Sequence, residues 1–125
     1  MHRIYLASTL ENREKLQPIA RQLILLGHQI TSRWVFEPED GLSEHDIAVR
    51  DLQDLNAADT LVFWPDEETK RSSGKFVEYG YALGRGKPTY VVDRDSSKCV
   101  FLQLDSFLVT YVANWDELLQ IFRSL

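Results

Sequence analysis

The sequence predicts an α/β domain built on a mostly parallel sheet of five strands. Short apolar runs alternate along the chain with longer segments whose apolar residues recur at helical spacing, which is typical of strand–helix–strand units. The length of 125 residues suits one domain, so we expect residues 1–125 to fold as a single unit. Hydrophobic residues make up 44% of the chain and charged residues 26%, which excludes disordered and fibrous proteins.

The chain opens with a predicted strand and a predicted helix. Arg3–Ser8 is apolar and β-favouring and predicts the first strand. Glu11–Leu26 predicts a helix, although Pro18 requires that the helix begins near it or is kinked in its first turns. Gly27 suits the position just past the end of that helix. The helix residues predicted to face the core are Leu16, Ile19, Ala20, Leu23 and Leu26.

A second strand and a second helix follow. Gln29–Phe36 predicts the strand, and a polar loop separates it from the helix. Ser43 stands three residues before Asp46, which is typical of an N-cap and predicts a helix that runs through Ala57. Asp51 is expected to lie off the main apolar stripe of this helix. The apolar positions of the helix are Ile47, Val49, Leu52 and Leu55.

The second half of the chain repeats the alternation. A long polar loop over Pro65–Gly74 precedes a predicted helix, and the run from Asn114 to Glu117 resembles a capping box that begins a last helix. That last helix is expected to turn Leu118, Leu119 and Phe122 inward. The remaining predicted elements are strands at Thr60–Trp64, Pro88–Val92 and Phe107–Val112, and a helix at Lys75–Gly84.

This order of elements predicts a doubly wound, flavodoxin- or Rossmann-like domain. In such sheets a ligand binds beyond the carboxyl ends of the strands. The residues expected at that edge are Ala7–Thr9, Phe36–Glu37, Trp64 and Asp93. Any chemistry is therefore expected there.

Charge and composition exclude several classes of partner. The chain has 14 Lys and Arg against 19 Asp and Glu, a net charge of −5, so we expect neither nucleic acid nor a membrane as a partner. The single cysteine, Cys99, excludes an internal disulfide, and the scattered His2, His28 and His45 predict no metal site. The N-terminus enters a strand pattern without a signal-peptide core, which predicts a cytoplasmic protein.

The junction between the long loop and the helix after it is a candidate anion site. Ser72, Ser73, Gly74 and Lys75 combine two hydroxyl groups, a helix N-terminus and a lysine, a set that suits a 5′-phosphate. The alternative is a solvated loop in which a serine caps the helix.

Glu78 and two glycines distinguish that helix. Glu78 lies one turn into an otherwise apolar and aromatic helix, where a carboxylate either faces solvent or is held in a cleft for catalysis. Gly80 and Gly84 lie on one helix face, which indicates close approach of the backbone to a strand, a ligand or a second subunit.

Three further residues are candidates for substrate binding. Arg33 and Trp34 follow each other in the second predicted strand and suit a clamp on a base or phosphate, although packing of an arginine on an aromatic ring explains the pair equally well. Ser8 ends the first strand; no Gly-x-Ser-x-Gly elbow surrounds it, so we expect it to bind substrate and not to act as a nucleophile.

Taken together, these segments resemble the nucleoside 2-deoxyribosyltransferase family, including its small phage-type members and its relatives that hydrolyse 2′-deoxynucleoside 5′-monophosphates. The resemblance extends over essentially the whole chain and is most specific at the helix that carries Glu78. The matching segments are Ile4–Ser8, Thr31–Trp34, Asp51 eight residues before Asp59, Gly74–Gly84 and Gly86–Pro88.

The resemblance implies roles for individual residues. Glu78 would be the nucleophile that attacks C1′ of the deoxyribose and forms a covalent ester, which a base or water then resolves. Tyr5 is similar to the residue that orients this glutamate, and Asp51 to the residue at the sugar or at the proton-transfer position. Transferases usually have aspartate six residues before the nucleophile, where this chain has Ser72, as the monophosphate hydrolases do.

The sequence therefore predicts an enzyme that cleaves the N-glycosidic bond of 2′-deoxynucleosides or their 5′-monophosphates. The resemblance implies no metal and no organic cofactor, a small-molecule substrate as partner, and a homodimer or higher oligomer. Two alternatives stay open at this point: a non-catalytic nucleotide-binding module, and an NAD glycohydrolase of the kind built on TIR-like folds.

Overall fold

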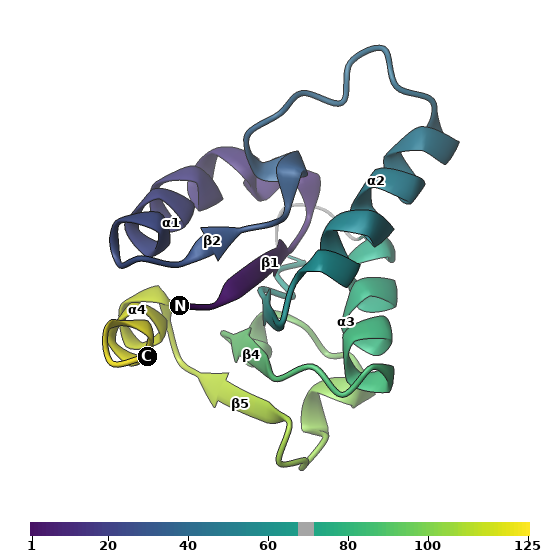
Figure 1. The fold of residues 1–125 in the computed structure, drawn as a ribbon. Helices are drawn as coiled ribbons and strands as arrows, with labels where there is room; N and C mark the ends of the chain where they lie inside the picture. The colour runs from purple at the N-terminus through teal and green to yellow at the C-terminus, as the bar shows by residue number, and fades with distance from the viewer. Residues whose placement is uncertain (68–71) are drawn as a thin grey trace.

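Five parallel strands form the centre of the molecule, in the spatial order β2-β1-β3-β4-β5 (Figure 1). The structure, a computed structural model, describes residues 1–67 and 72–125. The predicted fold class is confirmed, and this strand order is the flavodoxin-like one. The strands are β1 (Arg3–Ala7), β2 (Gln29–Ile30), β3 (Thr60–Phe63), β4 (Thr89–Val92) and β5 (Val109–Val112). The helices are α1 (Arg13–Leu25), α2 (Glu44–Ala57), α3 (Gly74–Gly84) and α4 (Trp115–Arg123).

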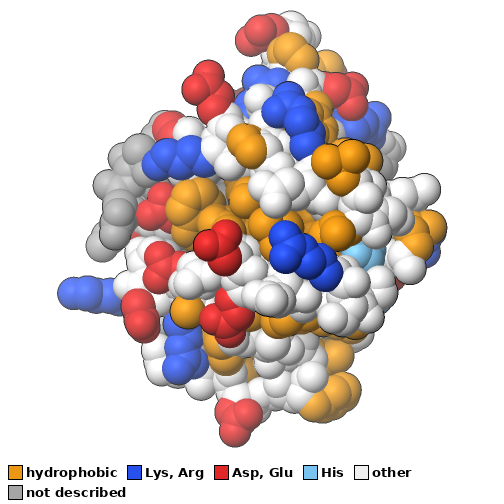
Figure 2. Space-filling model, turned by 90° about the vertical axis from the view of Figure 1, so that its left-hand side faces the viewer, with side chains coloured by type: hydrophobic (Ala, Val, Ile, Leu, Met, Phe, Trp, Pro, Cys, Tyr) orange, Lys and Arg blue, Asp and Glu red, His pale blue; other side chains and the backbone are white. Residues whose placement is uncertain are grey.

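Helices cover both faces of the sheet. α1 and α4 lie on one face, and α2 and α3 lie on the other (Figure 1). Both faces of β1 and β3 are therefore buried, which explains why these strands read as continuous apolar runs. On the face formed by α1 and α4, acidic and basic side chains are interspersed among hydrophobic ones (Figure 2). No helix within the described residues is long and apolar enough to cross a membrane, and the cytoplasmic location stays a prediction.

The predicted caps of two helices are confirmed. Ser43 Oγ accepts a hydrogen bond from the backbone N–H of Asp46 at 3.1 Å. Asn114 Oδ1 accepts from the N–H of Glu117 at 2.9 Å, and Glu117 Oε2 accepts from the N–H of Ala113 at 3.2 Å. These bonds satisfy backbone donors that have no partner within the helix.

α1 begins five residues before Pro18, after a short 3₁₀ turn at Leu10–Asn12, so the helix continues through the proline. Gly27 has φ +96°, the left-handed conformation expected of a residue that ends a helix.

The second strand is much shorter than predicted. β2 ends at Ile30, and Arg33–Val35 form a 3₁₀ turn, so Arg33 and Trp34 do not belong to a strand. Side chains replace the missing strand bonds at Leu6 of β1. Ser32 Oγ accepts from the Leu6 N–H at 3.0 Å, and Trp34 Nε1 donates to the Leu6 carbonyl at 2.8 Å. The backbone N–H and carbonyl of Leu6 thus have hydrogen-bond partners without a longer β2 strand.

The placement of Asp51 off the apolar stripe of α2 was wrong. Ile47, Asp51 and Leu55 are spaced four apart and share the inward face of the helix, and Leu55 is fully buried. Val49 and Leu52, expected on the apolar face, are 38% and 44% exposed. Asp51 is therefore half-buried on the inward side of α2.

Candidate active site

A pocket of about 180 Å³ opens at the carboxyl edge of the sheet, where the fold class predicts a ligand. It brings together residues from β1, α2 and α3 and from the loops between them. The residues predicted from the sequence that line it are Tyr5, Ser8, Trp34, Asp51, Ser72, Gly74, Lys75 and Glu78. Leu10, Glu39 and Ile47 also line the pocket, although the sequence did not indicate them as site residues.

Tyr5 and Glu78 form the centre of this pocket. Tyr5 is fully buried in β1, and its hydroxyl donates a hydrogen bond to Glu78 Oε2 of α3. Burial raises the pKa of Glu78 to about 8, against the opposing effect of the hydrogen bond from Tyr5. Burial and the charge of Glu78 also raise the pKa of Tyr5, which stays protonated and keeps donating. The strand thus presents a fixed phenol that orients one oxygen of the carboxylate.

Asp51 contributes a second carboxylate from α2. Burial, and after it the charge of Glu39, raises the pKa of Asp51 to about 6. Its Oδ1 is buried and has no hydrogen-bond partner among the described residues. Two carboxyl groups with different raised pKa values in one cleft are typical of acid–base and nucleophilic chemistry at a sugar.

The pocket is also lined by a group of hydrogen-bond donors, namely Ser8, Ser72, Gly74 and Lys75. Lys75 is only 1% exposed, and its Nζ donates to Thr9 Oγ1 at 3.3 Å and to the Ser72 carbonyl at 2.9 Å. Burial lowers the pKa of Lys75, while Glu67 and Asp66 oppose that effect. The lysine therefore fixes the end of β1 to the start of α3.

Ser73 takes a different position from its neighbours. It is exposed, it does not line this pocket, and it faces an apolar groove on the other side of α3 together with Val77, Gly80 and Phe101. Its side chain makes no capping hydrogen bond among the described residues, so the alternative of a serine-capped helix start is not supported. Arg71, which directly precedes Ser72, lies outside the described residues.

Arg33 is brought near the site but is engaged elsewhere. Its Nε donates to Asp54 Oδ1 at 2.9 Å, and its Nη2 donates to Gln53 Oε1 at 3.3 Å. Among the described residues that line the pocket, Trp34 is present and Arg33 is absent. Trp34 is 5% exposed, and the bond from Trp34 Nε1 to Leu6 holds its ring in place.

Gly80 and Gly84 do not approach another part of the chain closely. A Cβ atom at either position would meet no atom of the described residues within 4 Å, and both glycines are exposed. Close approach to a strand, one of three explanations drawn from the sequence, is therefore wrong. Among the described residues, no group of three or more His, Cys, Asp and Glu side chains suits a metal ion.

Glu39 was missed because it has no motif around it. It lies in the polar loop between the 3₁₀ turn and α2, and it lines the pocket with Asp51 and Glu78. Its position in the sequence could have indicated it. The loop that contains Glu39 follows the second predicted strand, and loops after parallel strands lie together at the carboxyl edge of the sheet.

Comparisons with known proteins agree with this geometry. The family model described as nucleoside 2-deoxyribosyltransferase matches residues 4–107. A search of curated proteins finds no match.

Similar solved structures extend over almost the whole chain. The CMP N-glycosidase BcmB of Clostridium botulinum is 19% identical with a TM-score of 0.71, covering 98% of this chain and 99% of that one. A 2-deoxyribosyltransferase of Bacillus psychrosaccharolyticus is 25% identical with a TM-score of 0.67, covering 93% and 89%. A conserved protein of Enterococcus faecalis is 16% identical with a TM-score of 0.70, covering 99% and 98%.

Proposed function

Because this chain belongs to the nucleoside 2-deoxyribosyltransferase family and its function is of the deoxyribosyltransferase or N-glycosidase type, we propose that it cleaves the N-glycosidic bond of 2′-deoxynucleoside 5′-monophosphates through a covalent deoxyribosyl ester of Glu78. One observation carries this proposal. The buried hydroxyl of Tyr5 is bonded to Glu78 in a pocket that Asp51 also lines.

The first step forms the ester. An ionised oxygen of Glu78 attacks C1′, the bond from C1′ to the base nitrogen breaks, and its electron pair leaves with the base. Asp51 supplies the proton that the base takes up. The carboxylate stabilises the positive charge that develops on the sugar, and a 2′-deoxy sugar develops that charge readily because it has no electron-withdrawing 2′-hydroxyl.

The raised pKa values of the two carboxyl groups determine how one proton is shared before this step. With values of about 6 for Asp51 and about 8 for Glu78, the pair holds one proton through the neutral range. The reaction uses the form in which Asp51 holds that proton and Glu78 is ionised. Because the pKa of Glu78 is the higher of the two, this form is the less populated one, and the hydrogen bond from Tyr5 increases its population by stabilising the glutamate anion.

The second step resolves the ester. A water molecule or a second base attacks C1′, the bond to the Glu78 oxygen breaks, and the glutamate returns as a carboxylate. Asp51, now ionised, takes the proton from the attacking group, as microscopic reversibility requires. Attack by water gives hydrolysis, and attack by a base gives transfer.

A 5′-phosphate suits the hydrogen-bond donors that line the pocket. The hydroxyl groups of Ser8 and Ser72 and the start of α3 at Gly74 provide donors, while Lys75 adds positive charge. Glu78 and Asp51 line the same pocket, and their carboxyl groups disfavour an anion beside them. The phosphate is therefore expected at the donors and the sugar beside the carboxyl groups.

The test is a product analysis on matched substrates. Base release is measured from 2′-deoxynucleosides and from their 5′-monophosphates, with and without an added acceptor base. The proposal predicts release from the monophosphates at a kcat/KM at least about tenfold above that of the nucleosides. Exchange of bases between free nucleosides, with no effect of phosphate, would assign transferase activity and contradict the phosphate site. No base release from any substrate would contradict the proposed function itself.

We also propose that the chain forms a homodimer or higher oligomer. The exposed apolar groove over α3, which includes Val77 (65% exposed), Gly80 and Phe101 (63% exposed), supports this assembly. Sedimentation of the purified chain tests the proposal. A mass of two or more chains agrees with it, and a monomer at micromolar concentration contradicts it.

A further inference from the structure

The pocket continues into a second hollow of about 480 Å³ between α1 and the loop before α2. The two cavities share the lining residues Leu10, Trp34 and Glu39. The inner cavity, about 180 Å³, is below the roughly 300 Å³ at which pockets for small molecules begin. The inner cavity is therefore too small for a whole nucleotide: with the sugar and its phosphate placed there as in the proposed function, the base extends past the three shared residues.

The chemistry fixes which part of the nucleotide extends there. The base leaves C1′ on the side opposite the attacking oxygen of Glu78. The phosphate is expected at Ser8, Ser72 and Lys75, which leaves Ile47 and the three shared residues to face the base. The shared residues are the ones at which the pocket meets the second hollow.

Glu39 is held at this junction as an anion. Its Oε1 lies 3.7 Å from Nη2 of Arg50, and the two side chains are only 23% and 11% exposed. Among the described residues, Nε and Nη2 of Arg50 have no hydrogen-bond partner, so Glu39 is the carboxylate that the structure pairs with this buried guanidinium. After burial, the charge of Glu39 is also among the causes that raise the pKa of Asp51 and Glu78.

An ionised carboxylate accepts hydrogen bonds and donates none. At the rim of the base site it bonds to an exocyclic amino group, and it repels a carbonyl oxygen placed at the same position. On the basis of the proposed function, we propose that Glu39 is a specificity-determining residue that selects bases with an amino group, such as cytosine and adenine, over their keto counterparts.

The experiment compares two nucleotides that differ at one exocyclic position. The ratio of kcat/KM for 2′-deoxycytidine 5′-monophosphate to that for 2′-deoxyuridine 5′-monophosphate is measured for the wild type and for Glu39→Gln. The wild-type ratio is expected to be at least about 10, and glutamine, which both donates and accepts, is expected to lower it about tenfold or more. The matched control is Glu44→Gln, which removes an exposed carboxylate at the start of α2 that lines neither cavity and is expected to leave the ratio unchanged.

Glu39→Gln leaves the buried guanidinium of Arg50 without its carboxylate, which destabilises the fold, so a second variant accompanies the first. Glu39→Gln with Arg50→Gln removes both charges together, and the same fall in the ratio is expected. A wild-type ratio near 1, or a Glu39→Gln variant that slows both nucleotides equally, would overturn the proposal while base release still upholds the proposed function. The absence of release from every nucleotide would contradict both.

Discussion

The two edges of the sheet are both rich in charged groups, but they hold them differently. At the amino edge, Asp59 accepts from the N–H of Arg3 at 3.1 and 3.2 Å and from Thr60 Oγ1 at 2.9 Å. Lys87 Nζ donates to three carbonyls near the end of α2, those of Leu55, Asn56 and Ala58. At the carboxyl edge, Asp51 leaves a buried oxygen without a partner among the described residues.

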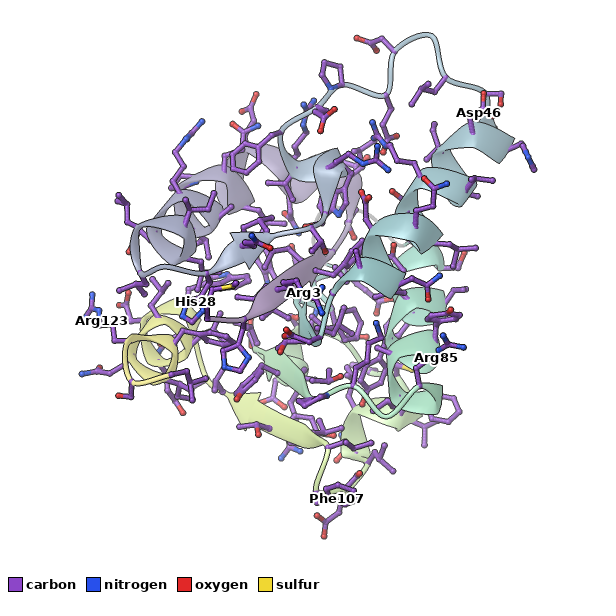
Figure 3. All side chains as sticks on the ribbon, viewed as in Figure 1. Arg3, His28, Asp46, Arg85, Phe107 and Arg123 are labelled. Carbon is purple, nitrogen blue, oxygen red and sulfur yellow. The ribbon has the colours of Figure 1, made fainter. Side chains whose placement is uncertain are left out.

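The histidines extend this contrast. His28 is buried at the amino edge, where its Nδ1 accepts from the N–H of His2 at 3.0 Å and its Nε2, the remaining protonated nitrogen, donates to the Phe122 carbonyl at 2.9 Å. Figure 3 shows His28 and Arg3 near this edge, well away from Asp46 at the start of α2. At the amino edge, hydrogen-bonded polar groups stabilise the fold, whereas the carboxyl groups of Asp51 and Glu78 at the other edge have raised pKa values because they are buried.

The pKa values express the same difference. Burial alone would raise the pKa of Asp59, but the hydrogen bonds from Thr60 and from the N–H of Arg3 lower it below its ordinary value. The pKa of Glu78, by contrast, is raised by burial to about 8. Asp59 therefore stabilises the folded state as an anion, whereas ionisation of Glu78 costs stability.

The largest expected effect is on catalysis at the carboxyl edge. Glu78→Gln keeps the shape of the side chain but removes the nucleophile, so base release is expected to fall at least about 1,000-fold. Release from 2′-deoxynucleoside 5′-monophosphates, followed by chromatography, measures the effect. Glu44→Gln is the control, because Glu44 is exposed at the start of α2 and is outside the described lining of the pocket. A Glu78→Gln variant with the wild-type rate would break the contrast between the two edges.

At the amino edge the expected effect is on stability. Lys87→Met removes the ammonium that bonds to three carbonyls, so the free energy of unfolding is expected to fall by about 1–3 kcal/mol. Urea unfolding measures this fall, and the exposed Lys98→Met provides a comparison that is expected to change little. The kcat of the folded enzyme is expected to be unchanged. A loss of activity with no loss of stability would show that the amino edge belongs to the site.

Tyr5→Phe sharpens the assignment within the site. Without the hydroxyl, Glu78 loses the donor that orients it, and kcat is expected to fall about tenfold. The same hydrogen bond lowers the pKa of Glu78, so the fall of activity at high pH, where the pair loses its last proton, is expected to shift to higher pH in the variant. A pH–rate profile measures both effects. A lower kcat with an unchanged profile would indicate a purely structural role for Tyr5.

The smallest expected effect is a pH-dependent difference in stability. Since the folded-state pKa of Glu78 is raised from 4.5 to about 8, its contribution to stability is fully present below about 4.5 and is lost as the pH rises toward 8. Glu78→Gln cannot ionise and avoids this loss. Its Tm is expected to exceed that of the wild type by a few degrees at pH 9, and the gap is expected to narrow at pH 5. A gap that is constant with pH would contradict the burial of this carboxylate.

The fold could be predicted because its signals are local. The apolar runs of β1 and β3 and the caps at Ser43 and Asn114 depend on neighbours in sequence, and the structure confirms them. The length of the second strand could not be predicted, because Ser32 and Trp34 satisfy Leu6 through contacts between distant parts of the chain. The side chains of Ser32 and Trp34 here replace the backbone hydrogen bonds of a longer second strand.

In the candidate site, too, residues with a local sequence signal could be predicted and those placed by distant contacts could not. Glu78 stood out as a carboxylate in an apolar helix and Tyr5 was identified by resemblance, and the structure brings the two side chains together. Asp51 was also identified by resemblance, but the inward face of α2 was assigned wrongly. That face itself contains two acidic residues, Asp51 and Asp54, so the apolar pattern did not reveal it. Glu39 has no motif and reaches the pocket only through the course of its loop, so no local pattern could reveal it.

Trapping the intermediate tests the central role of Glu78 most directly. The enzyme is denatured with acid during turnover of a 2′-deoxynucleoside 5′-monophosphate, digested, and mapped by mass spectrometry. The account predicts a deoxyribosyl phosphate adduct on the peptide that contains Glu78, absent from Glu78→Gln. Turnover of the same substrate with an adduct on another residue, or with none under conditions in which the ester is stable, would contradict it.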